Sequence, residues 1–289
     1  MAIAKGKEIG AHILIATDPD ADRVGIAVKD HEGEYVLLTG NQTGALMIHY
    51  ILEQRGQQGT LPKNGKIFDT IVTSKLGASI GRGYGVDTHS TLTGFKFIGE
   101  WARLMETTDE DFLFGYEESY GYVVQDFVRD KDAVQAVLMC VEMAAFYNRQ
   151  GFSLLDMLQN LYKVYGFYQE DLINITLTGA DGAEKIQTIL ANFRETPLAD
   201  IAGLKIATIE DYQTSLSHSL VNNATSVINL PKSNVLKYIL EDGSWFALRP
   251  SGTEPKLKVY ISVVTPSKSA SLSRLSDIKA ELNKLLESE

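Results

Sequence analysis

Residues 15–28 read IATDPDADRVGIAV and place three aspartates at alternate positions, followed by an arginine, between two apolar runs. Like charges as close in sequence as Asp18, Asp20 and Asp22 raise one another's pKa and cost stability unless a positive charge sits among them. The flanking apolar runs predict two strands, so the acids lie in the turn that joins them. The stretch therefore predicts a cation-binding turn within a sheet.

The spacing of the three acids matches the start of a calcium-binding loop but departs from it further on. Counted from Asp18, the sixth position is Arg23 where an EF-hand has glycine, and the twelfth is Lys29 where it has glutamate. Three carboxylates after a strand, with Pro19 restricting the backbone, suit a small hard cation that keeps one position open for a phosphate oxygen. Magnesium fits best. The alternative is a solvated acidic turn without an ion.

Composition describes an ordinary globular chain. Its 289 residues, 44% of them hydrophobic, exceed what one core usually serves, which predicts two or three domains. The net charge of −10 and a pI near 5.1 argue against a nucleic-acid partner, because phosphate backbones need a basic face. The single cysteine, Cys140, excludes an internal disulfide. No apolar run has the roughly 20 residues of a membrane span and no signal-peptide pattern is present, so we expect a cytoplasmic protein without a membrane partner.

Strand and helix patterns alternate along the first part of the chain, which favours α/β units with parallel sheets. Asn41 is the expected cap of the first long helix, and the polar segment 56–65 is the expected linker after it. Gly151 is expected to close a long helix and Ser153 to cap the next. The expected strands cover residues 12–16, 24–28, 35–39, 66–73 and 111–114, and the expected helices cover 41–55, 75–82, 95–105, 132–148 and 153–165.

From residue 171 onward, strand patterns dominate. Asp242 and Gly243 predict a tight turn between two of these strands, which indicates an antiparallel α+β domain. The expected fold is therefore a set of mixed α/β domains followed by a C-terminal α+β domain with an antiparallel sheet. Its expected strands cover residues 172–177, 204–209, 235–240, 245–248 and 257–264, with helices at 183–193 and at the C-terminal end.

Two further motifs carry chemistry. Residues 114–122, FGYEESYGY, place two acids and a serine after a strand, where an α/β sheet usually presents its ligand groups, and a glutamate there suits sugar hydroxyls. Residues 248–256, LRPSGTEPK, set an arginine, two hydroxyls and a lysine around a glycine between two strands, which suits a phosphate group. The alternatives are a polar turn over packed tyrosines for the first motif and a simple β-turn with a surface arginine for the second.

With these motifs in place, the chain resembles the α-D-phosphohexomutases, the phosphoglucomutase and phosphomannomutase family. Residues 18–23 (DPDADR) resemble its magnesium loop, 117–121 (EESYG) its sugar-recognition loop and 249–256 (RPSGTEPK) its phosphate-binding loop. Residues 93–96 (TGFK) and 129–132 (RDKD) stand between them in the family's order. The resemblance covers nearly the whole chain and implies the mixed α/β phosphohexomutase fold.

The resemblance also implies roles for individual residues. Asp18, Asp20 and Asp22 bind Mg2+, while Arg23 and Lys131 face the reacting phosphoryl group as catalytic residues. Lys131 is also the candidate general base. The EESYG form looks more like the glucose-preferring members than the mannose-tolerant ones. The implied substrate-binding residues are Thr93, Gly94, Lys96, Glu117, Ser119, Arg249, Ser251, Gly252, Thr253 and Lys256.

The chain departs from the family before its metal loop. The family's first domain has a threonine-alanine-serine-histidine-asparagine loop that carries the phosphorylated serine, and no such loop occurs here. The resemblance therefore implies a C-terminal portion whose partner is the missing N-terminal portion of the same polypeptide. Residues 1–65 are expected to be the end of the second, metal-loop domain, 66–168 the third, sugar-binding domain and 169–289 the fourth, phosphate-binding domain.

The implied reaction interconverts hexose 1-phosphate and hexose 6-phosphate through a phosphoserine and a bisphosphate intermediate, with glucose preferred. Its cofactors are Mg2+ and glucose 1,6-bisphosphate, the latter as activator and intermediate. The chain alone is expected to be inactive because it has no serine loop. Two other functions stay open: a sugar-phosphate-binding or regulatory module without catalysis, and a metal-dependent phosphohydrolase with Asp18 as nucleophile.

Overall fold

The computed structural model describes residues 1–177, 182–252 and 254–287, which form two compact units, Met1–Tyr165 and Gly166–Glu289. None of the helices in these ranges combines the length and the apolar character that crossing a bilayer requires. The overall class agrees with the sequence-based expectation: mixed α/β structure first, then a unit with an antiparallel sheet.

The first unit begins with a short helix and a three-stranded antiparallel sheet. Helix α1 (Ala2–Ile9) precedes strands β1 (Ile13–Thr17), β2 (Val24–Lys29) and β3 (Tyr35–Leu37), in the sheet order β1-β2-β3. The acidic turn joins β1 to β2, as the apolar runs on its two sides predict. Helix α1 was not expected from the sequence, and these three strands form an antiparallel meander rather than a parallel α/β unit.

Helix α2 (Gly40–Gln57) follows β3 and begins at a different residue from the one expected. Its cap is Thr39, whose Oγ1 accepts from the Gln42 N–H at 3.2 Å while the Thr39 N–H donates to Gln42 Oε1 at 3.0 Å. The prediction of Asn41 as the cap is wrong, because Asn41 is buried in the helix and its Oδ1 accepts from the Ser74 N–H. The helix also extends two residues into the expected linker.

A four-stranded, mostly parallel sheet forms the middle of the first unit. Its order is β5-β4-β6-β7, with β4 parallel to β5 and β6, and β7 antiparallel to β6. The α/β prediction is confirmed here, although β5 and β7 were not expected. The elements are β4 (Gly65–Thr70), α3 (Leu76–Gly83), β5 (Asp87–Thr91), α4 (Phe95–Met105), β6 (Asp111–Tyr116) and β7 (Tyr122–Val123).

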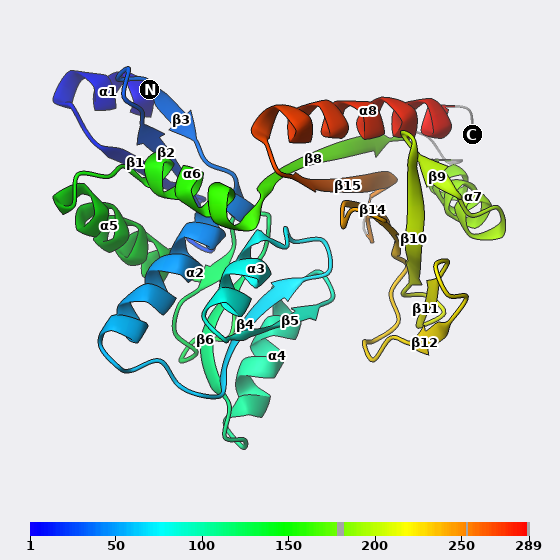
Figure 1. The fold of residues 1–289 in the computed structure, drawn as a ribbon, viewed down its shortest axis with the longest axis horizontal. Coiled ribbons are helices and arrows are strands. Elements are labelled where there is room, and N and C mark those ends of the chain that lie inside the picture. Colours follow the sequence, from blue (N-terminus) through cyan, green and yellow to red (C-terminus); the bar gives the residue numbers. More distant parts are fainter. Residues whose placement is uncertain (178–181, 253, 288–289) are drawn as a thin grey trace. The chain divides into compact units, whose positions relative to one another are not determined.

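Two helices complete the first unit: α5 (Ala133–Arg149) and α6 (Leu154–Tyr165). Ser153 caps α6 as expected, with its Oγ accepting from the Asp156 N–H at 3.2 Å. Helix α2 contacts α3, α5 and α6, which places it among the elements that follow it in the chain (Figure 1). The domain division expected after residue 65 stays a prediction.

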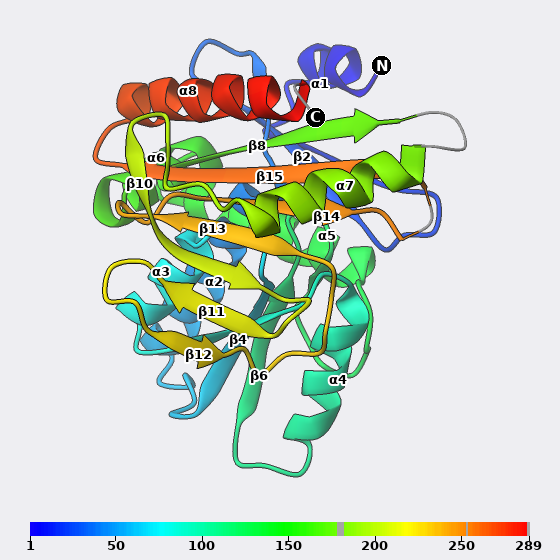
Figure 2. The same ribbon diagram turned by 90° about the vertical axis from the view of Figure 1, so that its right-hand side faces the viewer.

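The second unit is built on one antiparallel sheet, in which the described strands follow the order β12-β11-β10-β13-β14-β15-β8, with β9 paired to β10 (Figure 2). The β13–β14 hairpin confirms the turn predicted at Asp242 and Gly243. Short polar strands β9, β11 and β12 were not expected. The elements are β8 (Phe167–Thr176), α7 (Gly182–Glu195), β9 (Asp200–Ile201), β10 (Leu204–Asp211), β11 (Leu216–Ser219), β12 (Thr225–Val227), β13 (Leu236–Leu240), β14 (Trp245–Pro250), β15 (Lys256–Thr265) and α8 (Lys268–Glu287).

The first and last strands of the second unit pair with each other. Strands β8 and β15 run antiparallel from the pair Phe167 and Thr265 to the pair Thr176 and Lys256. Helix α8 lies along both strands, and its Ser271 hydroxyl donates to the Phe167 carbonyl at 2.5 Å (Figure 2). Buried side chains of α7 and α8 share one apolar core with the strands. The two helices therefore stabilise the sheet that carries residues 248–256, the phosphate-loop motif.

Candidate functional site

The acidic turn of residues 18–23 is organised by its own first aspartate. Asp18 Oδ1 accepts from the N–H groups of Asp22 (3.1 Å) and Arg23 (3.0 Å). The Arg23 N–H is the main reason why the pKa of Asp18 lies below its ordinary value. Ala21 sits in the left-handed region, with a φ of 55°, which tightens the turn.

One ligand oxygen from each of Asp18, Asp20 and Asp22 lies within 4.8 Å of the others. Among residues 1–177, 182–252 and 254–287, no other group of three acidic, histidine or cysteine side chains meets this spacing. Three ionised oxygen donors this close fit a small hard divalent cation such as Mg2+, which prefers carboxylate oxygens and keeps several waters. The geometry therefore fits the predicted magnesium site.

Backbone hydrogen bonds join the acidic turn to residues 114–122, the sugar-loop motif. The Val24 N–H donates to the Tyr120 carbonyl at 3.1 Å, and Arg23 forms an antiparallel bridge with Gly121. The Ala133 N–H, at the start of α5, donates to the Ala21 carbonyl at 3.0 Å. The acidic turn thus meets two later segments, around residues 120–121 and 133, at one place in the first unit.

Glu117 is the first of the two acids in the sugar-loop motif and is only 7% exposed. Its Oε1 accepts from the Gly94 N–H at 2.9 Å, at the start of α4. Burial raises the pKa of Glu117, and the Gly94 N–H and the Lys131 charge partly offset that rise. Gly94 has a φ of 116°, which side chains rarely adopt, so a glycine is required where its N–H meets the carboxylate.

Lys131 connects the sugar loop to the acidic turn. Its Nζ lies 3.1 Å from Asp22 Oδ2 and 2.9 Å from Asp130 Oδ1. Burial alone would lower the pKa of Lys131, but hydrogen bonds to Asp130 and Asp22 raise it above the ordinary value. The lysine therefore carries its positive charge beside a carboxylate of the acidic turn.

The other residues expected in the first unit have fewer contacts with the cluster that Asp22, Glu117 and Lys131 form. Arg23 is half exposed, with Nε 3.9 Å from Asp22 Oδ1. Thr93 and Ser119 are partly exposed next to Gly94 and Glu117 in the chain. Lys96 is exposed on α4, its Nζ lies 4.9 Å from the centre of the Phe97 ring, and within the part of the chain that the structure describes no hydrogen bond or ion pair joins it to Asp22, Glu117 or Lys131.

The phosphate-loop motif lies in the second unit, between β14 and β15. The Ser251 N–H donates to the Lys256 carbonyl at 2.7 Å, which closes the loop. Lys256 Nζ pairs with Glu254 Oε2 at 2.9 Å, and Arg249 Nη1 lies at 3.4 Å from the Tyr260 hydroxyl. Thr253, also expected to bind substrate, lies outside the described residues.

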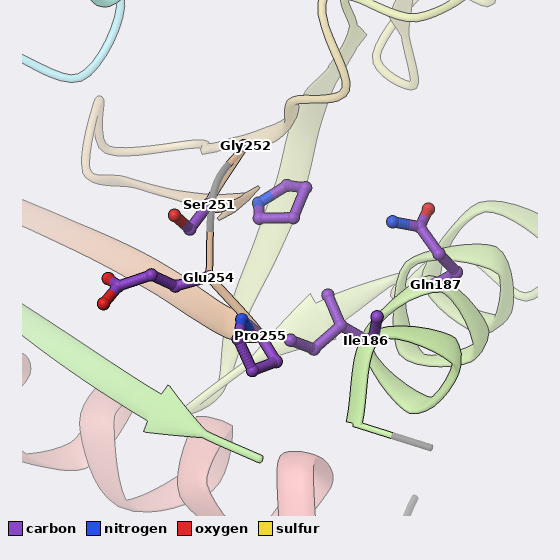
Figure 3. Close-up of a pocket in the computed structure, with 8 residues that line it drawn as sticks. Ile186, Gln187, Ser251, Gly252, Glu254 and Pro255 are labelled. Atoms are coloured by element: carbon purple, nitrogen blue, oxygen red, sulfur yellow. The ribbon is translucent and has the colours of Figure 1, made fainter. Parts of the chain in front are cut away.

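A cavity of about 400 Å³ adjoins this loop. Ser251, Gly252, Glu254 and Pro255 lie on one side of it, and Ile186 and Gln187 of α7 lie on the other (Figure 3). Sequence reasoning missed the α7 wall, because Ile186 and Gln187 belong to an ordinary amphipathic helix without a motif. It also missed Asp130 and the Tyr120 carbonyl, although the RDKD and EESYG stretches contain both.

Two models of one protein family match this chain. The family model described as "Phosphoglucomutase/phosphomannomutase, alpha/beta/alpha domain III" matches residues 39–165. The model of the same family's C-terminal domain matches residues 172–274, so the two together span most of the chain. The first match begins well before residue 66, where the sequence predicts the start of the third domain.

Curated relatives are similar over the same region. A phosphoglucomutase of Staphylococcus aureus (strain USA300) is 41% identical over 266 residues, which are 92% of this chain and 47% of that protein. The phosphoglucomutase of strain MSSA476 is 41% identical over 262 residues, 91% of this chain and 46% of that protein. The chain thus spans about half the length of the curated relatives it matches.

Solved structures share the fold. Parafusin, a phosphoglucomutase from Paramecium in its open form, matches with a TM-score of 0.66 at 20% identity, covering 99% of this chain and 48% of that one. A phosphoglucomutase/phosphomannomutase family protein from Burkholderia thailandensis matches with a TM-score of 0.61 at 16% identity, covering 99% and 48%. The fold of this chain therefore occurs in proteins with very different sequences.

Proposed function

The chain belongs to the phosphoglucomutase/phosphomannomutase family, and from that premise we propose that it supplies the metal-binding, sugar-binding and phosphate-binding parts of a mutase. The reaction interconverts hexose 1-phosphate and hexose 6-phosphate, with glucose as the preferred sugar. A phosphoserine outside this sequence donates and receives the phosphoryl group, and glucose 1,6-bisphosphate is the intermediate.

The observation that carries the proposal is the cluster in the first unit. Asp22, Glu117 and Lys131 come from three separate segments. The Lys131 ammonium pairs with Asp22, and its stem lies over Gly121 next to Glu117. Backbone hydrogen bonds join residues 120 and 133 to the acidic turn. A buried carboxylate that accepts one N–H and keeps a second oxygen has the chemistry to bind sugar hydroxyls. An ammonium beside it suits a phosphoryl group.

The residues divide the work between the two ends of the substrate. When bound by Asp18, Asp20 and Asp22, Mg2+ supplies positive charge beside the transferring phosphoryl group. Glu117, with Ser119 and Thr93, orients the sugar hydroxyls, and Arg23 and Lys131 neutralise the reacting phosphoryl group. Arg249, Ser251, Gly252 and Lys256 of the second unit hold the phosphate that is not reacting. Because either phosphate can occupy either place, the sugar must bind in two orientations.

Hexose recognition by Glu117 is tested with Glu117→Gln. The variant keeps the size of the side chain but loses the carboxylate, so the affinity for glucose 1-phosphate in the presence of Mg2+ should fall about tenfold or more. Titration calorimetry of parent and variant measures this change. Glu100→Gln, an exposed change on α4, is the control and should bind like the parent. Equal affinities for parent and Glu117→Gln would remove Glu117 from hexose recognition and with it the proposed function.

The phosphate loop is tested with Arg249→Lys. A guanidinium can bind phosphate through two parallel N–H groups and an ammonium cannot, so the affinity for inorganic phosphate should fall by about tenfold. The melting temperature should stay almost unchanged, because the hydrogen bond from Arg249 to Tyr260 is long. Arg274→Lys, in the same unit, is the control. If Arg249→Lys binds inorganic phosphate with the same affinity as the parent, the loop is a simple turn and not a phosphate site.

A further inference from the structure

Lys131 is the best-placed cation at the acidic turn, although it belongs to a different segment. Its Nζ lies 3.1 Å from Asp22 Oδ2 and the side chain is only 13% exposed. Arg23, within the turn itself, lies further from Asp22 at 3.9 Å and its side chain is 52% exposed. The partly buried ammonium therefore neutralises one of the three carboxylates that a divalent cation would use.

The position of this ammonium is set by packing as well as by charge. The lysine stem lies across Gly121, where an added Cβ would come within 2.7 Å of Lys131 Cγ and 3.6 Å of Glu117 Oε2. The Nζ atom lies 5.6 Å from the centre of the Phe95 ring, at the start of α4. One side chain thus lies near the acidic turn, the sugar loop and the start of α4, where the Gly94 N–H donates to Glu117.

Asp130 gives the ammonium a second acid, 2.9 Å from Nζ, and this acid is not one of the three in the turn. A divalent cation on Asp22 would repel the ammonium at this range, because like charges a few ångströms apart interact strongly when partly buried. The lysine could then leave Asp22 without losing its last acidic partner. The stem, held over Gly121, keeps the released charge near Glu117 and Phe95.

We propose that Lys131 is an exchangeable counter-ion of the acidic turn: it occupies Asp22 when no divalent cation is bound and is released toward the sugar loop when one binds. The exchange weakens metal binding to the turn and links it to recognition of the anionic sugar phosphate, since the released ammonium favours an anion. The link to the sugar phosphate rests on the proposed function. The competition between the ammonium and the cation for Asp22 does not depend on the proposed function.

The competition is measured with Mn2+ as the probe, by electron paramagnetic resonance, without any sugar. Lys131→Met should bind Mn2+ about five to ten times more tightly than the parent, because no ammonium has to leave Asp22. Lys131→Arg, which keeps the charge, should stay close to the parental affinity. Lys29→Met removes the same charge at the far end of β2 and should change the affinity less than twofold. Asp20→Asn should abolish the binding and so assign it to this turn.

Thermal melting of each variant shows whether it is folded, and Lys131→Gln replaces Lys131→Met if the latter is not. Unchanged or weaker Mn2+ binding in the folded variant would overturn the proposal. In a second arm, calorimetry measures how much Mg2+ strengthens glucose 1-phosphate binding, and this enhancement should be smaller in Lys131→Met than in the parent. An undiminished enhancement would overturn the link. If the parent binds no sugar phosphate, the proposed function fails while the Mn2+ result stands.

Discussion

Gly40→Ala is expected to lower the free energy of unfolding of the first unit by about 3 kcal/mol, or roughly 6–12 °C in melting temperature. Gly40 begins α2, and a Cβ there would overlap the Glu118 carbonyl and lie 2.7 Å from Glu118 C and 2.8 Å from Tyr120 N. These are backbone atoms of the sugar loop, so no side-chain rotation can make room. Either α2 or the loop must move.

The same helix offers a matched control. Gly56 lies near the other end of α2, is exposed, and has nothing within 4 Å of an added Cβ. Gly56→Ala should therefore stabilise the unit by about 0.5–1 kcal/mol through helix propensity alone. Urea unfolding followed by far-ultraviolet circular dichroism measures both variants. Similar stabilities for Gly40→Ala and Gly56→Ala would show that α2 and the sugar loop do not pack as closely as described.

The 289-residue chain should show no mutase turnover on its own. A mutase must store a phosphoryl group between its two half-reactions, and the stabilising roles proposed for Asp22, Lys131 and Glu117 do not replace the nucleophile that receives it. The sequence has no equivalent of the family's serine loop. The assay is coupled conversion of glucose 1-phosphate to glucose 6-phosphate with Mg2+ and glucose 1,6-bisphosphate present.

The reference for this assay is Asp20→Asn, which should give the same background rate as the parent chain. Adding the part of a Staphylococcus aureus phosphoglucomutase that the chain does not match is the complementation arm, where turnover above background is expected. Turnover by the chain alone would mean that one of its own serines accepts the phosphoryl group. Ser90 would then be examined first, because its hydroxyl donates to buried Asp69 at 2.5 Å and accepts from Lys75 at 2.8 Å.

The candidate site residues could be proposed from the sequence where they are neighbours in the chain. The three acids of the turn and the phosphate-loop motif each lie within one short segment, so their residue types and spacing predict a cation site and a phosphate site. Strands β4 and β6 of the parallel sheet and the β13–β14 hairpin were also predictable, because apolar runs and an Asp-Gly turn mark them. The resemblance to the mutase family added the expectation that these segments act together, and the family matches confirm that the chain belongs to the family.

The connections within the site were not predictable from residue types. The bonds from Val24 to Tyr120 and from Ala133 to Ala21 are made by backbone atoms, which every residue possesses. Strand β5 was missed because its residues, DTHST, are polar and show no apolar alternation. At the start of α2, asparagine is the better cap in isolation, but the reciprocal bonds between Thr39 and Gln42 decide the start of the helix.

The pairing of β8 with β15 has a consequence for the order in which the chain acquires its structure. The pair joins Phe167 to Thr265, a long loop to close, and long-range pairing of this kind slows folding. On the ribosome, the strands and helices of residues 1–165 are complete before β8 is made, so this part can fold first. The edges of β8 and β14 must wait for residues 256–265 before they can pair with β15. During that interval β8 and β14 each have an edge that β15 does not yet cover, and the nascent second unit depends on continued synthesis to cover these edges.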